Sequence, residues 1–163
     1  MLSDLSKAYE HIRYAALRAR AATFGFPLRL LRLLLALYAM DRVLVFDGAA
    51  AQPFRPQNGV AAGCSFADLM MRLMVLAAMD AVQEAWPSVL GAAVVDDMQL
   101  QTMGPRGTAT RTMKGAAKLL HRTLLDAKLV VNVGKLALLS NDREAAAEVA
   151  KGVQTHIRHA VHV

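Results

Sequence analysis

Two adjacent aspartates interrupt an apolar part of the chain and limit how that part can fold. Asp96 and Asp97 stand between the apolar residues 90–95 and a second, mainly apolar run at residues 98–103. Burying neighbouring carboxylates is costly unless another group compensates their charge. The pattern therefore predicts a β-hairpin over residues 90–103, with the two acids at its turn.

The rest of the chain alternates between helical and strand periodicity. Helices are predicted over residues 6–24, 28–39, 64–85, 110–127 and 142–153, a first hairpin over residues 42–54, and two short strands over residues 128–133 and 135–139. This order of elements favours an α+β fold in which helices cover one face of an antiparallel sheet. We expect residues 1–163 to form a single domain, with residues 154–163 as a frayed tail.

The composition excludes several classes of protein. The 163 residues are 55% hydrophobic, which is too apolar for a disordered chain, and the single cysteine, Cys64, cannot build a disulfide framework. No signal peptide is recognisable at the start, and the most apolar stretch, residues 28–40, contains two arginines and is shorter than the ~17–25 residues that cross a bilayer. We therefore expect an intracellular protein in a reducing compartment, nuclear or cytoplasmic, without a membrane segment.

The aspartate pair also suggests a chemical role. Carboxylates at a hairpin tip present oxygen ligands to a hard cation such as Mg²⁺, although aspartates are also common in simple surface turns. Asp4 is a further candidate, because it either caps the first helix or faces the same metal ion as Asp96 and Asp97.

Four segments resemble the motifs of reverse transcriptases, in the order in which that family has them. Residues 4–9 resemble motif A, residues 59–67 motif B, residues 94–97 motif C and residues 129–135 motif D. The stretch between motifs A and B is similar to that of non-LTR retroelements. The resemblance covers residues 4–140, which is most of the chain.

This resemblance implies an RNA-directed DNA polymerase domain of a retroelement, with a palm-like antiparallel sheet backed by helices. Asp4, Asp96 and Asp97 would then be the catalytic acids that bind two Mg²⁺ ions, or Mn²⁺ in their place. Such a site transfers a nucleotide to the 3′-hydroxyl of a primer by a two-metal mechanism. The implied partners are an RNA template, a DNA primer and dNTPs.

Three more residues are implied to bind the nucleotide. Tyr9 matches the aromatic residue beneath the incoming sugar, Gly63 lies where the backbone approaches nucleotide or template, and Lys135 matches the motif D lysine near the triphosphate. From the residues alone, Tyr9 fits a core position on a helix equally well, and Lys135 fits a solvated strand end.

The chain departs from the family pattern in its residues and in its extent. Ala62 stands where motif B has glutamine, which removes an amide that could bind nucleotide or template, and Val94 replaces the aromatic residue that opens motif C. The fingers region is largely absent and the thumb is absent; both would belong to a longer polyprotein. We therefore expect weak polymerase activity, or none, from the chain alone.

Two other functions stay open at this point: a non-catalytic palm remnant that binds nucleic acid or proteins, and an α+β interaction module unrelated to polymerases. The net charge of +6 suits contact with a nucleic-acid backbone. A solvated helix face is the alternative explanation for the basic residues of the helix predicted over 110–127, and the apolar surplus predicts exposed patches and self-association. The candidate nucleic-acid contacts on that helix are Arg111, Lys114, Lys118 and Arg122.

Overall fold

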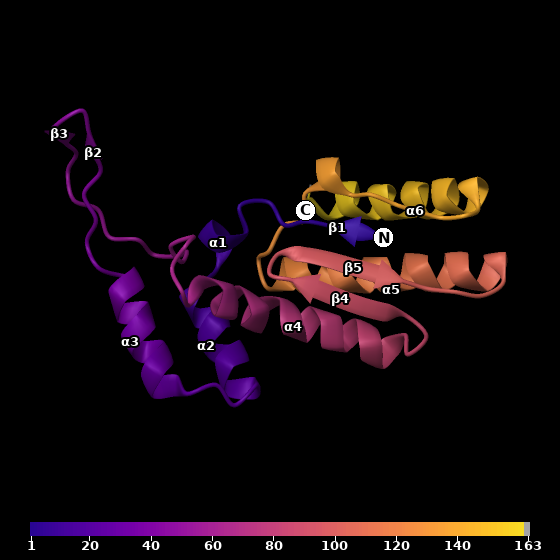
Figure 1. Cartoon of the computed structure of the whole chain (residues 1–163), viewed down its shortest axis with the longest axis horizontal. Helices are drawn as coiled ribbons and strands as arrows, with labels where there is room; N and C mark the ends of the chain where they lie inside the picture. Colours follow the sequence, from indigo (N-terminus) through magenta and orange to yellow (C-terminus); the bar gives the residue numbers. More distant parts are fainter. Residues whose placement is uncertain (162–163) are drawn as a thin grey trace. The chain divides into compact units, whose positions relative to one another are not determined.

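The computed structural model describes residues 1–161, and the chain divides into two compact units (Figure 1). We call them the sheet unit, which comprises Met1–Ala8 and Val75–Val163, and the helical unit, which comprises Tyr9–Met74. Helices and small antiparallel sheets make up both, which confirms the predicted α+β class. Within the described residues, no helix combines the length and the apolar character needed to cross a bilayer.

The three-stranded sheet of the sheet unit forms around the predicted hairpin. Strands β4 (Leu90–Val94) and β5 (Asp97–Gln101) pair antiparallel with Val94 opposite Asp97, which confirms the hairpin. The prediction that both acids form its turn is wrong for Asp97, because the two turn residues are Val95 and Asp96 and Asp97 is the first residue of β5. Strand β1 (Leu2–Ser3) pairs antiparallel with the other side of β5, so the strand order is β1-β5-β4. The start of the chain thus lies beside a hairpin formed much later in the sequence.

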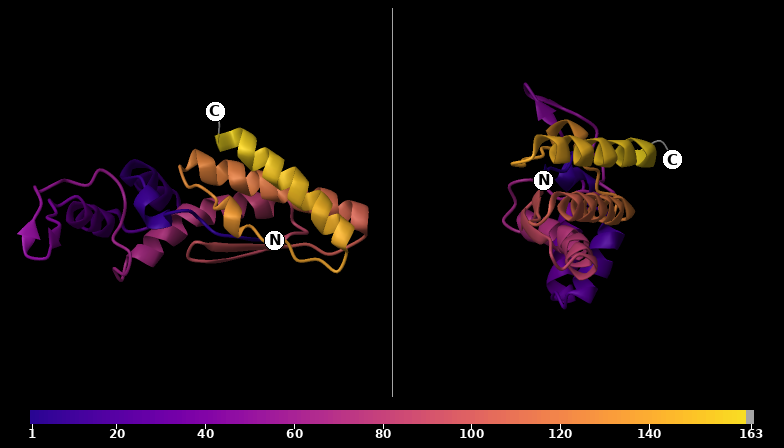
Figure 2. Two further views of the ribbon diagram at one scale, coloured as in Figure 1. Left: turned by 90° about the horizontal axis from the view of Figure 1, so that it is seen from above. Right: turned by 90° about the vertical axis from the view of Figure 1, so that its right-hand side faces the viewer.

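The two faces of this sheet have different environments. Along β5, Met98 and Leu100 are buried and alternate with Asp97 and Gln99, which point to the opposite face. Figure 2 shows the helices of the sheet unit on one side of the β4–β5 hairpin. These helices are α5 (Arg106–Asp126), α6 (Arg143–Val161) and the C-terminal part of α4 (Ala67–Ala85).

The prediction of two short strands over residues 128–133 and 135–139 is wrong, because the structure has no strand there. The segment instead makes single β-bridges at Val131 and Ala137, both with residues next to or within β1. Between the bridges the backbone turns through the short 3-10 helix η1 (Val133–Lys135). Neither half therefore stays extended over the several residues that a strand needs.

Helix α6 is longer than the sequence predicts. It runs to Val161, so the expected frayed tail is wrong for residues 154–161, and residues 162–163 lie outside the described part of the chain. Val153 and Ile157 are buried four residues apart in α6, which packs along α5. The helix continues because this apolar stripe continues.

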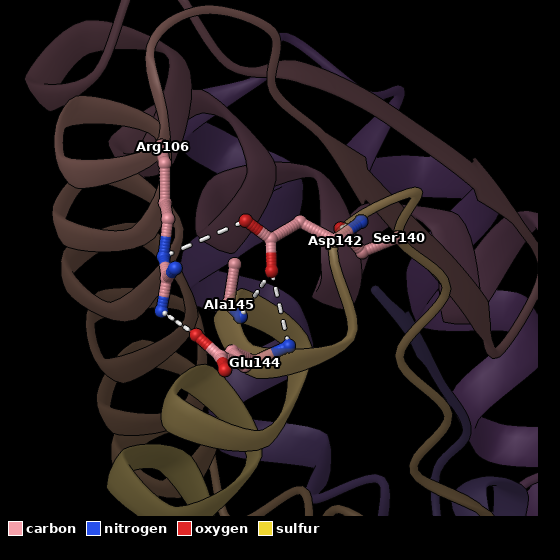
Figure 3. Close-up of polar contacts among 5 residues, drawn as sticks. All are labelled: Arg106, Ser140, Asp142, Glu144 and Ala145. Atoms are coloured by element: carbon pink, nitrogen blue, oxygen red, sulfur yellow. Dashed lines mark hydrogen bonds and ion pairs between the residues drawn. The ribbon is translucent and has the colours of Figure 1, made fainter.

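Asp142 caps α6 and links it to α5 (Figure 3). Its Oδ1 accepts hydrogen bonds from the backbone N–H groups of Glu144 and Ala145, both at 3.0 Å. Arg106, in the first turn of α5, forms ion pairs with Asp142 Oδ2 at 3.5 Å and with Glu144 Oε2 at 2.8 Å. One arginine thereby connects the beginnings of both helices.

In the helical unit, the helix predicted over residues 6–24 is interrupted. It forms α1 (Ala8–His11) and α2 (Tyr14–Thr23). The break follows from a tertiary contact, because the carbonyl of Ile12 accepts a hydrogen bond from the Gly59 N–H at 2.8 Å. Helical periodicity in the sequence carries no sign of that contact.

The next two predicted elements of this unit are confirmed. Helix α3 (Leu28–Tyr38) follows, and the first hairpin consists of β2 (Val45–Phe46) and β3 (Ala49–Ala50). Helix α3 is buried on one side only, at Leu31, Leu34, Leu35 and Tyr38. The large apolar side chains exposed along α3 and the hairpin are Leu28, Leu33, Leu37, Met40, Val43, Leu44, Val45 and Phe46.

Candidate functional site

The register of β1 on β5 determines where Asp4 lies. Ser3 pairs with Met98, so the antiparallel order places Asp4 next to Asp97, just beyond the last paired residues. Because side chains alternate along a strand, Asp4 and Asp97 share the face opposite to the buried Met98. Asp4 is nonetheless buried to about nine-tenths, with a relative exposure of 9%.

An open groove of about 390 Å³ follows this face of the sheet. The charged residues in its wall are Asp4, Asp97 and Lys135. The rest of the wall is made by residues of β1, β4 and β5 and by one residue after η1: Leu2, Ser3, Ala92, Val94, Met98, Gln99 and Ala137. Asp4, Asp97 and Lys135, which are distant in sequence, thus line one groove together with mainly apolar residues.

Asp96 occupies the turn between β4 and β5. The preceding residue, Val95, has φ 58°, a left-handed conformation that a β-branched residue rarely adopts. Partial burial raises the pKa of Asp96, and the carboxylates of Asp4 and Asp97 raise it further, although Lys135 and a backbone hydrogen bond oppose them. The three acids therefore share one electrostatic environment.

Lys135 reaches the acids because its segment runs back along β1. The Asn132 N–H donates a hydrogen bond to the Asp4 carbonyl at 2.8 Å, and the Asn132 side chain accepts one from the Gly134 N–H at 3.1 Å, which starts η1. Lys135 Nζ then lies 2.9 Å from Asp4 Oδ2. This contact is the main cause of the raised pKa of Lys135, with smaller contributions from Asp97 and Asp96.

The donor set of this site suits a hard cation. Asp4 pairs with the ammonium group of Lys135, and the pKa of Asp96 is raised mainly by burial and less by the carboxylates of Asp4 and Asp97. Carboxylate oxygens are the ligands that Mg²⁺ prefers. Among residues 1–157, whose side chains the structure describes, no three His, Cys, Asp or Glu side chains are already positioned around one metal position. A cation here would require the side chains to rearrange, beginning with Lys135 leaving Asp4.

The other two predicted nucleotide-binding residues, Tyr9 and Gly63, belong to the helical unit. The Tyr9 hydroxyl donates a hydrogen bond to Asp68 Oδ1 at 2.6 Å, a partner that the sequence analysis missed. Gly63 has φ +83°, and the space where a Cβ would stand is open. Gly59 is constrained more tightly, because a Cβ there would lie 3.2 Å from the backbone of Glu10.

The four basic residues of α5 do not share one environment. Lys114 is half-buried and its Nζ pairs with Glu148 Oε1 of α6 at 2.7 Å, so it contributes to the contact between the two helices. Arg111, Lys118 and Arg122 are exposed. Of the four predicted nucleic-acid contacts, only these three side chains therefore face solvent.

Comparison with known proteins adds no functional assignment. Neither the models of protein families nor the curated proteins include a match to this chain. A functional proposal therefore depends on the cluster of Asp4, Asp96, Asp97 and Lys135 and on the motifs that contain these residues.

Proposed function

We propose that this chain carries the acidic centre of a reverse transcriptase-like palm, and that the centre serves RNA-directed DNA synthesis. The supporting observation is the meeting of Asp4 with Asp96 and Asp97. Asp4 directly follows β1, Asp96 lies in the β4–β5 turn and Asp97 begins β5, so the acids come from two places that are distant in sequence and adjacent in the sheet. The proposal agrees with the resemblance of residues 4–9 and 94–97 to motifs A and C.

In this function, Asp4, Asp96 and Asp97 would hold Mg²⁺. When bound, the metal would make the primer 3′-hydroxyl more nucleophilic and stabilise charge on the leaving pyrophosphate. Lys135 is mostly exposed, so its ammonium group can turn from Asp4 towards a triphosphate. The exposed Arg111, Lys118 and Arg122 would contact template or primer phosphates.

Metal binding is the first test of this proposal. Mn²⁺, a paramagnetic substitute for Mg²⁺, is titrated into the whole chain and detected by electron paramagnetic resonance. We expect Asp96→Asn to weaken Mn²⁺ binding about tenfold or more, because it removes a charged ligand. Asp80→Asn is the matched control, since Asp80 is an exposed acid of α4 in the same unit. Equal affinity in both variants would contradict the proposal.

Nucleotide binding is the second test. A dNTP should tighten Mn²⁺ binding to the wild-type chain, because its phosphates add oxygen ligands. Lys135→Gln should reduce this effect, whereas Lys128→Gln, a change at an exposed lysine that precedes the bridged segment, should not. A primer-extension assay with an RNA template then relates any bound nucleotide to synthesis, and Asp96→Asn should abolish whatever extension is found.

A second candidate function is a non-catalytic palm remnant that binds nucleic acid or protein. It is favoured by the ion pair between Lys135 and Asp4, which engages a carboxylate oxygen that a metal would need. It is also favoured by the lack of a preassembled three-ligand group among the described side chains of residues 1–157. If this function is correct, the wild-type chain should bind Mn²⁺ no more tightly than the Asp96→Asn variant does. It should also bind duplex nucleic acid with an affinity that falls as the salt concentration rises.

A further inference from the structure

Strand β4 is the outer strand of the three-stranded sheet (Figure 1). One of its sides pairs with β5, and no strand of the described chain pairs with the other side. All five of its residues, Leu90–Val94, are exposed. The outer edge of a sheet can accept a further strand, because it presents backbone N–H and C=O groups that have not yet paired.

The hydrogen bonds of β5 show which backbone groups of β4 point outward. The Leu100 N–H donates to the Met1 carbonyl at 2.9 Å, and the Met1 amino group donates to the Leu100 carbonyl at 2.6 Å. Leu100 therefore bonds on the β1 side. Because bonding directions alternate along an antiparallel strand, Gly91, which is opposite Leu100, directs its N–H and C=O away from β5, and so does Ala93. Among the described groups, the backbone of Gly91 and of Ala93 has no other hydrogen-bond partner.

The usual protections of a sheet edge are missing from β4. Natural proteins protect their edges with charged side chains, proline or β-bulges. Residues 90–94 contain no charge and no proline, and their register with β5 runs unbroken from Leu90 opposite Gln101 to Val94 opposite Asp97. The edge is also apolar near both ends, since Leu90 is 59% exposed and Val94 is 70% exposed. Its side chains therefore favour pairing with another strand.

We propose that β4 pairs antiparallel with β4 of a second copy of this chain, about a two-fold axis at Ala92, so that the two sheets join into one. In this register, the outward backbone groups of Gly91 meet those of Ala93 in the second copy. Each such pair exchanges two hydrogen bonds, and the axis generates the pair twice. The proposal goes beyond the proposed polymerase function and does not rest on it, because it uses only the free edge of the sheet.

The side chains of β4 fit this register. Leu90 and Val94 are its two large apolar residues, and each would lie opposite the other across the axis, while Ala92 would face its own counterpart. These three residues share one face of the strand, the face on which Ala92 and Val94 line the groove of the carboxylate cluster. Leu90 of the second copy would therefore extend the wall of that groove.

Charge favours the antiparallel arrangement over a parallel one. Asp96 and Asp97 follow closely after β4. In a parallel pair they would lie beside the same two acids of the second copy, and like charges on neighbouring strands repel each other. In the antiparallel pair, the acidic turn of one copy instead lies near the residues that precede β4 in the other. These residues are uncharged: Trp86, Pro87 and Ser88.

Disulfide formation at single positions tests both the partner and the register. Cys64, the only cysteine, is first replaced by serine in the whole chain. Ala92→Cys then places a thiol at the axis, opposite its own copy in a pair without hydrogen bonds, where the Cα atoms are about 4.5 Å apart and a disulfide fits. Ala93→Cys is the matched control, because it changes the adjacent exposed alanine, whose counterpart in the second copy is Gly91.

The two cysteine variants are compared in a glutathione redox buffer, and the disulfide-linked dimer is measured by non-reducing electrophoresis. We expect the dimer of Ala92→Cys to form about tenfold faster than that of Ala93→Cys, because only the first pair of thiols has the geometry of a disulfide. Equal rates in the two variants, or a faster rate for Ala93→Cys, would overturn the proposal.

Charge variants at the axis give a second test that needs no disulfide. Ala92→Lys and Ala92→Glu each place like charges opposite one another, so each variant alone should associate about tenfold more weakly, and an equal mixture should recover the association. Ala147→Lys and Ala147→Glu, at an exposed alanine of α6, are the controls and should have no effect, alone or mixed.

Sedimentation velocity measures the association of these variants, after circular dichroism has shown that each one is folded. Every chain also carries Leu44→Ser and Phe46→Ser, so that contacts through the exposed apolar residues of the helical unit contribute little. A mixture of Ala92→Lys and Ala92→Glu that associates no more tightly than either variant alone would overturn the proposal. It would exclude a second copy as the partner of β4 and leave a strand of another protein as the remaining one.

Discussion

Asp96 shows how the partial burial of a single charged side chain can lower the stability of the fold. Its pKa is raised in the folded chain by partial burial and by the carboxylates of Asp4 and Asp97. An acid with a raised pKa binds its proton more tightly when folded, so its favourable contribution is present at low pH and is lost as the pH rises through the folded pKa. At neutral pH the charged Asp96 therefore lowers the stability of the chain.

This reasoning predicts that Asp96→Asn raises the melting temperature at about pH 7, where the wild-type carboxylate is charged. The difference should shrink near pH 3, where Asp96 is protonated and resembles asparagine in charge. Thermal unfolding followed by circular dichroism at both pH values measures it, with Asp80→Asn as the control for loss of an exposed acid. A lower melting temperature for Asp96→Asn at pH 7 would show that the charge is compensated in some other way.

Residue-scale reasoning from sequence recovered only part of this site. The hairpin and the turn position of Asp96 could be predicted because the apolar residues on both sides are local information, whereas the register that places Asp97 in β5 and Val95 in the turn could not. That Asp4 meets the two acids depends on the pairing of Ser3 with Met98, which no local pattern encodes, so the residues alone left a helix cap as an equal alternative for Asp4 and the motif resemblance favoured the meeting. The hydrogen bond from Tyr9 to Asp68 could not be predicted for the same reason.

At the scale of elements, the β4–β5 turn stores strain next to the acids. Val95 has φ 58°, and a β-branched residue in that region costs about 1–3 kcal/mol. Glycine adopts the conformation freely but loses more entropy on folding, by about 0.5–1 kcal/mol. We therefore expect Val95→Gly to stabilise the chain by about 1 kcal/mol, as measured by urea unfolding. A destabilised Val95→Gly would mean that packing of the valine side chain outweighs its backbone strain.

The beginnings of α5 and α6 give a second prediction at this scale. Hydrogen bonds from the N–H groups of Ala145 and Glu144 lower the pKa of Asp142, as does Arg106. An acid with a lowered pKa stabilises the fold above its unfolded pKa, and this contribution is lost as the pH falls through its folded pKa. Asp142→Ala should therefore lower the melting temperature by about a few degrees at pH 7 and by less at pH 3.

Asp142→Asn distinguishes the cap from the ion pair in the same experiment. Asparagine can still accept the two N–H groups, so it should retain most of the stability if capping dominates. It would resemble Asp142→Ala if the ion pair with Arg106 dominates.

Element boundaries were predictable where local signals set them and not where tertiary contacts did. The Leu-rich α3 and the β4–β5 hairpin follow from periodicity and turn residues. The break between α1 and α2 depends on the Ile12 carbonyl being taken by Gly59, and the segment around η1 depends on bridges to β1. Both errors arise where hydrogen bonds between distant segments override local preference.

For the whole molecule, the exposed apolar residues of the helical unit predict self-association. Phe46 is 86% exposed, and Leu44 and Val45 beside it are also largely exposed. Apolar residues that gather on a surface favour contact with another molecule. Sedimentation velocity should show a weight-average mass that rises with concentration, and Phe46→Ser combined with Leu44→Ser should reduce the rise.

Leu139→Ser provides the control for this association. Leu139 is 79% exposed but lies in the sheet unit, away in sequence from the apolar hairpin. Its replacement should leave the concentration dependence unchanged. A monomer at all concentrations would show that the apolar residues of the helical unit have no affinity for a second copy.

The pairing of β1 with β5 also determines when the carboxylate cluster can form during folding. Ser3 must find Met98, and closing so long a loop costs much more chain entropy than closing the two-residue turn of the β4–β5 hairpin. Contacts of such high sequence separation slow folding. The hairpin with Asp96 and Asp97 should therefore form early, and Asp4 should join it only when the two ends of the sheet unit meet. The cluster would then be a late product of folding and the first structure lost on partial unfolding.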